Sequence, residues 1–274
     1  MTRLRRLREP LTVLAFLLPV LVLFGAFRFL PMLGAAGLSV TDYRPGGEFE
    51  FVGAENYTGL AEDQYFLASL RTTLTYVAIY VPLILVVALG TALLLHSVPW
   101  GRGFFRAALF APYVTSLVLS GVIWKWLFEP AGVLQDPSTV LPALAVVAVW
   151  KGFGYAMLIL LAGIRNVPAD CLEAATVDGA NGWQRFRHML LPSLRPAMFF
   201  VVVVETIGAF QVFDLIYVMT TGGPVRASYT LAYAVYQYGF TYFEVGKAAA
   251  AGLVLWAIVL LVSLTQRRAF ERNP

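Results

Sequence analysis

Residues 139–162 read TVLPALAVVAVWKGFGYAMLILLA, an apolar run that holds one charged side chain, Lys151. At a rise of about 1.5 Å per residue, a helix of this length crosses the roughly 30 Å of hydrocarbon in a bilayer. Backbone polar groups find no partner in lipid, so a spanning segment must be a helix or part of a closed barrel. Because the run lacks period-2 alternation, we predict a transmembrane helix.

The composition extends this expectation to the whole chain. Of 274 residues, 59% are apolar and 13% are charged, whereas about 25% of the residues of a soluble domain are charged. This balance excludes a disordered chain and disfavours a soluble enzyme, because a soluble fold of this size cannot bury so much apolar surface. The single cysteine, Cys171, excludes a disulfide framework and a thiolate metal cluster within one chain.

We therefore expect an all-α integral membrane protein that forms one transmembrane domain over residues 1–274. The first apolar stretch could instead be a cleaved signal peptide, but its run of about 21 residues exceeds the roughly 7–15 residues of a typical signal sequence. Six stretches are long enough to span a bilayer. The expected spans are residues 11–31, 70–95, 105–128, 139–162, 196–218 and 246–266.

Basic residues set the expected orientation, because cytoplasmic loops carry an excess of Lys and Arg. Thirteen of the 20 basic residues fall on one side of the six spans, whereas acidic residues dominate the opposite connections. Both termini should therefore be cytoplasmic, and the partner that this charge indicates is membrane lipid and not nucleic acid. The thirteen are Arg3, Arg5, Arg6, Arg8, Arg102, Arg106, Arg165, Arg185, Arg187, Arg195, Arg267, Arg268 and Arg272.

The expected cytoplasmic loop at residues 163–195 is long for a connection between packed helices, and such loops are often functional. From Cys171 to Pro192 it reads CLEAATVDGANGWQRFRHMLLP, which predicts two short helices with a break at Gly179. Asn181 is a candidate cap of the second helix, and Pro192 is expected to end it. Two interpretations stay open: an amphipathic hairpin on the lipid surface, or a ridge that docks into a partner's cleft.

Three motifs in this loop resemble the EAA loop of the inner-membrane permeases of ABC importers. They are Glu173-Ala174-Ala175, Asp178-Gly179-Ala180 and Leu191-Pro192. In that family the loop forms coupling helices that sit in a groove of the ATP-binding subunit. By this resemblance, the coupling positions are Glu173, Ala174, Ala175, Asp178, Gly179, Ala180, Leu191 and Pro192.

Motifs outside the loop are similar to the first permease subunit of the maltose and glycerol-3-phosphate type. One connection departs from that family, because residues 129–138 form a shorter link between the third and fourth spans than is usual. The similar motifs are Phe104-Phe105-Arg106, Ala111-Pro112-Tyr113, Trp124-Lys125-Trp126-Leu127-Phe128, Met219-Thr220-Thr221-Gly222-Gly223-Pro224 and Gly53-Ala54-Glu55-Asn56-Tyr57.

The resemblance implies an ABC type I importer permease fold in the bacterial or archaeal cytoplasmic (inner) membrane. It implies a subunit that translocates a sugar or oligosaccharide, together with a second permease subunit, two ATP-binding subunits and an extracytoplasmic solute-binding protein. The two permeases are expected to form a heterodimer. This chain is expected to bind no cofactor, with ATP and Mg held by the partner ATPase subunits.

Three alternatives are weighed against this interpretation. Glycerol 3-phosphate or its diesters could be the solute of the same machinery. An ion-coupled secondary transporter would show an inverted repeat and paired intramembrane acids, and neither is visible in the sequence. A purely structural membrane protein would not need the coupling loop.

Sequence motifs for catalysis are absent. The chain contains no G-x-x-x-x-G-K-[ST] phosphate loop, no H-E-x-x-H or paired Cys/His spacing, and no G-x-S-x-G. We therefore expect a transport subunit without an ATPase site of its own and without a metal site.

Ionisable side chains inside spans cost about 2.5–3.5 kcal/mol on insertion scales, so each requires a reason. On a continuous fifth span, Glu205 and Asp214 would face opposite sides, because nine residues correspond to two and a half turns. On the same helix, Gln211, Asp214 and Tyr217 would share a face that could line a substrate path. Glu205 could line that path or find its partner on a neighbouring helix.

The fourth span contributes two further polar groups, Lys151 and Tyr155, which are one turn apart. A contact with substrate is possible for both, although pairing with an acidic residue is favoured for Lys151. The candidates for the substrate path are Gln211, Asp214, Tyr217, Glu205 and Tyr155.

Overall fold

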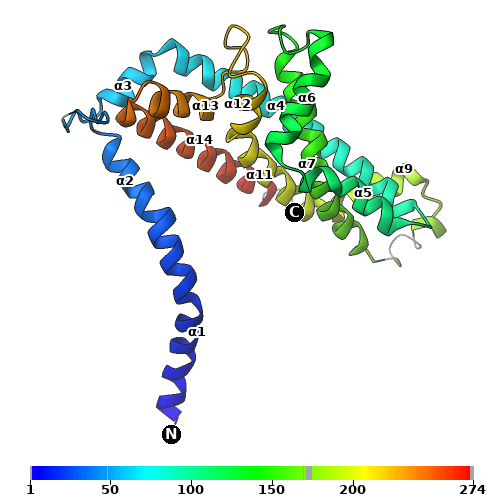
Figure 1. Cartoon of the computed structure of the whole chain (residues 1–274). Helices are drawn as coiled ribbons and strands as arrows, with labels where there is room; N and C mark the ends of the chain where they lie inside the picture. Colours follow the sequence, from blue (N-terminus) through cyan, green and yellow to red (C-terminus); the bar gives the residue numbers. More distant parts are fainter. Residues whose placement is uncertain (1, 48, 169, 171–174, 272–274) are drawn as a thin grey trace. The chain divides into compact units, whose positions relative to one another are not determined.

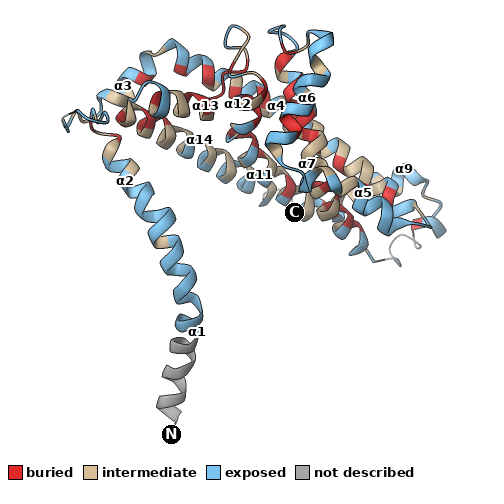
Figure 2. Ribbon diagram, viewed as in Figure 1, coloured by how far each residue is buried: buried red, intermediate tan, exposed pale blue. Residues whose placement is uncertain are grey.

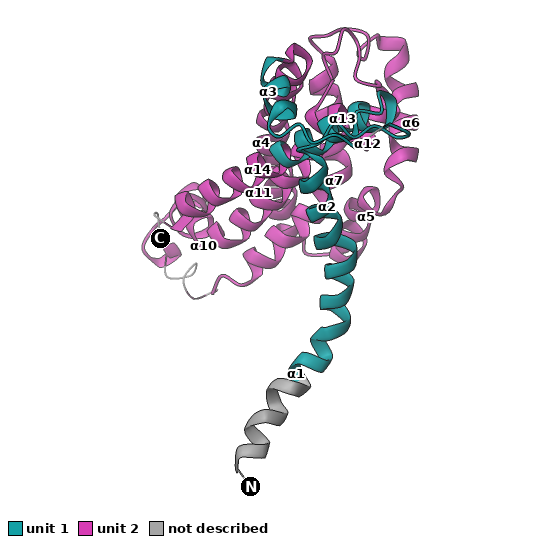
Figure 3. Cartoon of the chain, turned by 90° about the vertical axis from the view of Figure 1, so that its left-hand side faces the viewer, with its two compact units in different colours: residues 1–62, 235–254 teal, residues 63–234, 255–274 magenta. Residues whose placement is uncertain are grey.

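The structure is a computed structural model that describes residues 2–47, 49–168, 170 and 175–271. In these residues the regular backbone is helical, apart from one isolated antiparallel bridge between Thr41 and Phe51. The expected all-α fold class is therefore confirmed. The chain divides into two compact units, residues 1–62 with 235–254 and residues 63–234 with 255–274 (Figure 3).

The first unit opens with the first span, which is helical throughout. It consists of α1 (Thr2–Phe24), a π-helical turn at Gly25–Phe29 and α2 (Leu30–Leu38). None of the most apolar window in Val13–Leu38 is buried, and Figure 2 shows this helix as exposed along most of its described length (Figures 1 and 2). An apolar helix without a polar face is typical of a membrane span.

The remainder of the first unit explains the motif Gly53–Tyr57. Asn56, in α3 (Glu55–Glu62), donates from Nδ2 to the carbonyls of Ser39 and Thr41 at 2.9 Å each, so it ties down the chain that leaves the first span. A Cβ at Gly246, in α14 (Val245–Glu271), would overlap the Thr41 carbonyl. Glycine is therefore required where the last span begins. The unit also holds the end of α13 (Leu231–Tyr236) and a π-helical turn at Gln237–Thr241.

The second unit contains the most buried of the four long apolar helices. Half of the apolar window of α7 (Val140–Arg165) is buried, whereas 22% is buried in α4 (Gln64–Ser97). Asp63 caps the start of α4, because its carboxylate accepts hydrogen bonds from the backbone N–H groups of Tyr65 and Phe66. The other helices are α5 (Arg102–Val114), α6 (Leu117–Phe128), α9 (Gly182–Arg185), α10 (Leu191–Ser193), α11 (Arg195–Phe210) and α12 (Asp214–Met219).

The number of candidate spans agrees with the expected six when bent helices are counted as one span. Four helices are long and apolar enough to cross a membrane alone. Two further candidates are bent pairs: α5 with α6, at 91°, and the segment Gly182–Ser193 with α11, at 66°. The four single helices are Val13–Leu38, Gln64–Ser97, Val140–Arg165 and Val245–Glu271.

The expectation of one continuous third span over 105–128 is wrong. Helix α5 ends at Val114, and Thr115 and Ser116 are extended, with ψ of 154° and 133°. Ser116 restarts the helix, because its side chain accepts a hydrogen bond from the backbone N–H of Leu119. Pro112 lies just before the break and removes one backbone donor there.

The link between the third and fourth spans is a short ordered turn. It runs from a 3-10 turn at Glu129–Ala131 to the start of α7. Asp136 accepts hydrogen bonds at 2.8 Å from the backbone N–H and the hydroxyl of Ser138, and these bonds hold the pKa of the Asp136 carboxyl below its usual value.

Candidate functional site

The first candidate site is the loop that carries the three motifs, which turns sharply at Gly179. Gly179 has a φ of +80°. Its N–H donates to the Thr176 carbonyl at 3.1 Å, and the N–H of Ala180 donates to the Ala175 carbonyl at 2.9 Å. This pair of bonds is the Schellman pattern that ends a helix. The expected break at Gly179 is therefore confirmed.

The second arm of the loop begins with a reciprocal cap. Asn181 accepts a hydrogen bond from the backbone N–H of Gln184, and the Gln184 side chain accepts one from the backbone N–H of Asn181. Across the turn, Arg185 donates to the Thr176 hydroxyl at 2.8 Å and so joins the two arms. The Asn181 cap is confirmed.

The expected end of the second helix at Pro192 is confirmed to within one residue. The helix continues through Ser193, and the chain bends at Leu194 before α11 begins. Pro192 lies directly after the π-helical turn Phe186–Leu190, near the end of this continuous helix. Leu194 is fully buried, so it anchors the bend.

The loop combines one buried alanine with exposed apolar side chains near the turn. Ala175 is buried, while Asp178 and Gly179 are exposed and Ala180, Leu191 and Pro192 are half-buried. Val177 is 88% exposed and Trp183 is 65% exposed. Val177 belongs to none of the three motifs, and its only sequence signal is an apolar residue beside a turn. Glu173 and Ala174 lie outside the described residues.

The second candidate site is a cavity of about 360 Å³ within the second unit. Helices α4, α5, α7 and α11 and the chain after α11 contribute to its wall. The size is within the usual range for small-molecule sites, about 300–1,000 Å³. The polar residues that line it are Tyr76, Tyr80, Tyr113, Lys151, Tyr155, Glu205, Gln211 and Asp214.

Four of the five candidates for the substrate path line this cavity, namely Tyr155, Glu205, Gln211 and Asp214. The fifth, Tyr217, is absent from the lining and stacks on Phe213, with ring centroids 5.5 Å apart. The sequence had grouped Gln211, Asp214 and Tyr217 on one helix face, and this grouping is wrong for Tyr217.

A break in the fifth span is the cause of this difference. Helix α11 ends at Phe210 and α12 starts at Asp214, so the two segments do not share one helical period. Thr230 donates from its hydroxyl to the carbonyl of Val212 at 3.0 Å, which satisfies a backbone group exposed by the break. As a result, Glu205 and Asp214 line the same cavity and do not face opposite sides.

Glu205 has its partner on a neighbouring helix, which was one of the two alternatives expected for this residue. The Tyr80 hydroxyl donates to Oε2 of Glu205 at 2.7 Å, and Tyr80 stacks on the fully buried Tyr76 at 5.7 Å. A Cβ at Gly152 would lie 3.1 Å from the Tyr80 hydroxyl, so glycine leaves room for this arrangement.

Lys151 pairs with no acidic residue in the part of the chain that the structure describes, contrary to expectation. Its Nζ donates to the carbonyls of Pro112, Tyr113 and Thr115, at 3.1, 3.0 and 2.6 Å. The three acceptors lie where the third span breaks. The sequence concealed this contact because backbone carbonyls leave no residue-specific signal.

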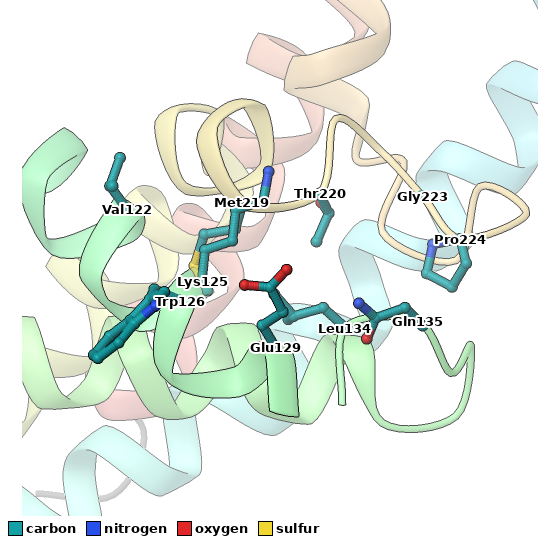
Figure 4. Close-up of a pocket in the computed structure, with 10 residues that line it drawn as sticks. All are labelled: Val122, Lys125, Trp126, Glu129, Leu134, Gln135, Met219, Thr220, Gly223 and Pro224. Carbon is teal, nitrogen blue, oxygen red and sulfur yellow. The ribbon is translucent and has the colours of Figure 1, made fainter. Parts of the chain in front are cut away.

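A third hollow, a recess of about 500 Å³, lies between the α6–α7 link and the turn after α12. Figure 4 shows Lys125, Glu129 and Gln135 on one side and Thr220, Gly223 and Pro224 on the other. Thr220 shares a hydrogen bond of 2.7 Å with Ser228, which fixes this turn. The described residues contain no cluster of His, Cys, Asp and Glu that could hold a metal ion.

Comparison with known proteins identifies the machinery to which these features belong. Residues 72–272 match the family model described as binding-protein-dependent transport system inner membrane component. The sn-glycerol-3-phosphate transport system permease protein UgpA of Agrobacterium fabrum is 33% identical and covers 96% of this chain and 97% of its own length. The probable ABC transporter permease protein YesP of Bacillus subtilis is 34% identical and covers 94% and 89%.

Solved structures support the fold. A chain from the crystal structure of a bacterial ABC transporter involved in the import of the acidic polysaccharide alginate has a TM-score of 0.83 at 20% identity. The match covers 100% of this chain and 99% of that one. With the family match, the helical architecture and the apolar spans, this chain belongs to the binding-protein-dependent inner-membrane permeases, the multi-pass transport subunits of ABC importers.

Proposed function

We propose that this permease subunit translocates a sugar or oligosaccharide. The observation that carries the proposal is the meeting of Glu205, Gln211 and Asp214 with tyrosine side chains in the 360 Å³ cavity. Carboxylate and amide oxygens accept hydrogen bonds from hydroxyl groups, and aromatic rings cover the apolar faces of a sugar. This combination suits a solute rich in hydroxyl groups.

Glycerol 3-phosphate is the second candidate, because several relatives are named as permeases for that compound. The two candidates are separated by uptake into proteoliposomes that contain the assembled transporter and its binding protein. Maltose, maltotriose, glycerol and glycerol 3-phosphate are supplied as radiolabelled solutes, with ATP inside. We expect ATP-dependent uptake of a sugar. ATP-dependent uptake of glycerol 3-phosphate alone contradicts the primary proposal.

The proposed assembly contains a second permease subunit, different from this one, and two ATP-binding subunits that hold ATP and Mg. An extracytoplasmic solute-binding protein delivers the solute. A structure similar to this chain contains an alginate ABC transporter in complex with an alginate pentasaccharide-bound periplasmic protein, which supports this part of the proposal. This chain itself is proposed to hydrolyse no ATP.

Coupling is proposed to run through the loop that turns at Gly179. The joined arms, with Val177 and Trp183 exposed near the turn, suit a rigid element that docks into a cleft. Closure of the ATPase pair moves the loop, and the spans change from inward-open to outward-open. ATP and the binding protein drive this change because each prefers one of the two states. The proposed coupling residues are Glu173, Ala174, Ala175, Asp178, Gly179, Ala180, Leu191 and Pro192.

Both termini are proposed to lie in the cytoplasm. Cysteines introduced at Gly47 and Gln135 should react with a membrane-impermeant thiol reagent from outside the cell, and native Cys171 should not. Reaction of Cys171 from outside intact cells contradicts the proposed orientation.

A further inference from the structure

Lys151 is the cationic side chain among the described residues that line the cavity. A lysine in such a place normally suggests a seat for a phosphate or a carboxylate. Relatives named for glycerol 3-phosphate and for alginate would favour the same interpretation. The hydrogen bonds of Lys151 indicate a different role.

All three N–H groups of the Lys151 ammonium have partners within the chain. An ammonium offers three donors, and the three acceptors are the carbonyls of Pro112, Tyr113 and Thr115, at 3.1, 3.0 and 2.6 Å. No donor of Lys151 is left for a solute while these bonds persist.

Lys151 supplies a donor to the Tyr113 and Thr115 carbonyls, whereas the Pro112 carbonyl also accepts from the backbone N–H of Thr115 at 3.3 Å and from its hydroxyl at 2.6 Å. Helix α5 ends at Val114, and the last carbonyls of a helix find no N–H donor within that helix. In a membrane an unsatisfied carbonyl is costly, and a cation at a helix C-terminus is favourable. Lys151 therefore serves as the cap of α5, supplied by another helix.

The same turn of α7 also fixes the backbone and a ring of α5. A Cβ at Gly154 would lie 2.5 Å from the Leu109 carbonyl oxygen, so the two helices touch there through bare backbone. Tyr155 stacks on Tyr113, with ring centroids 5.1 Å apart and planes at 13°. Both rings line the cavity.

We propose that Lys151 is a positioning residue, which caps the broken third span and thereby holds Tyr113 against Tyr155 in the cavity wall. It is not the seat of an anionic group. The groups that remain for the solute are Glu205, Gln211 and Asp214, which suit the hydroxyls of a neutral solute. This last consequence rests on the proposed function, because it assumes that solute enters the cavity.

Hydrogen exchange in the assembled transporter, held in lipid nanodiscs, tests the cap directly. Lys151→Met removes the donors but keeps the length of the side chain. The amides of residues 115–120 should then exchange roughly tenfold faster, and Lys151→Arg should restore slow exchange. Lys125→Met is the matched control, because Lys125 is an exposed lysine of the same span that makes no such bonds.

Exchange at the native rate in Lys151→Met overturns the cap. If that variant does not assemble, Lys151→Gln keeps two N–H donors, and intermediate exchange is expected. Native exchange in Lys151→Gln overturns the proposal equally, because one of three bonds is then lost without effect.

Reagents of opposite charge test whether Lys151 serves an anion. Gln211→Cys is made in a Cys171→Ser background and treated with methanethiosulfonates that carry a sulfonate or a trimethylammonium group. The cationic reagent should react faster, after correction for its reactivity in solution, because Glu205 and Asp214 line the same cavity. Faster reaction of the anionic reagent overturns the assignment.

Neither measurement depends on transport. If the assembled transporter takes up no sugar when ATP is supplied, the proposed function fails while the exchange result still decides the role of Lys151. If uptake is ATP-driven and the exchange rates are unchanged by Lys151→Met, the inference alone fails.

Discussion

Replacement of Gly179 by valine should detach the permease from its ATP-binding partner without unfolding it. Gly179 has a φ of +80°, and a Cβ at this position would meet no heavy atom within 4 Å. The penalty is therefore a backbone penalty and not a clash. A residue with a Cβ costs about 1–2 kcal/mol in this conformation, which lowers the ratio of native to non-native turn by a factor of about 5–30.

The assay is retention of a tagged ATP-binding subunit during purification, together with ATP-dependent uptake. Gly179→Val should reduce both by a similar factor, because only the native turn presents the two arms to the partner. Gly179→Asn should be milder, since Asn tolerates the left-handed region better than other residues.

Gly182→Ala is the matched control for this prediction. Gly182 lies three residues further on, has open space where a methyl group would point and starts helix α9 with an ordinary φ. Alanine favours helix, so this variant should retain partner and uptake. Native retention and uptake in Gly179→Val would refute the reasoning and return the loop to an amphipathic hairpin on the lipid surface.

Three further predictions concern the cavity and the packing. Asp214→Asn and Gln211→Ala should each raise the KM for uptake roughly tenfold, because each loses a hydrogen bond to the solute, while the ATP-binding subunit stays bound. A native KM in both variants would show that these residues do not line the substrate path. Gly154→Ala should lower the unfolding temperature, at a cost of about 1–3 kcal/mol, because its Cβ would meet the backbone of α5 at 2.5 Å. Gly90→Ala is the control, because a Cβ at Gly90 has open space and should be neutral. Equal unfolding temperatures of the two variants contradict the tight contact. Asn56→Ala removes two hydrogen bonds to carbonyls, so a protease added outside should cut the segment before α3 faster. An unchanged cleavage rate would show that these bonds are dispensable.

The sequence predicted those features that depend on local chemistry. Apolar length predicted the spans, and the glycine in Asp178-Gly179-Ala180 predicted a turn that the structure places at φ +80°. Asn181 was recognised as a cap for the same reason, because its preferred hydrogen bond lies three residues away along the chain.

The sequence did not predict features that depend on contacts between a side chain and a distant backbone carbonyl. The break between Phe210 and Asp214 is stabilised by Thr230, which lies far along the chain. The break at Thr115 is capped by Lys151 in the same way. A periodicity argument assumes an unbroken helix, so it placed Tyr217 with Asp214 and separated Asp214 from Glu205.

The unequal burial of the helices has a consequence for how the protein is made. No part of the most apolar window in Val13–Leu38 is buried, whereas half of that in α7 is. A helix that is apolar on all sides can leave the translocon for lipid as soon as it is synthesised. Helix α7 carries Lys151, whose partners lie in the chain around the end of α5, so its transfer to lipid is more favourable once that earlier segment is beside it. Synthesis from the N-terminus satisfies this order, because the acceptors for Lys151 are always in place before the lysine arrives.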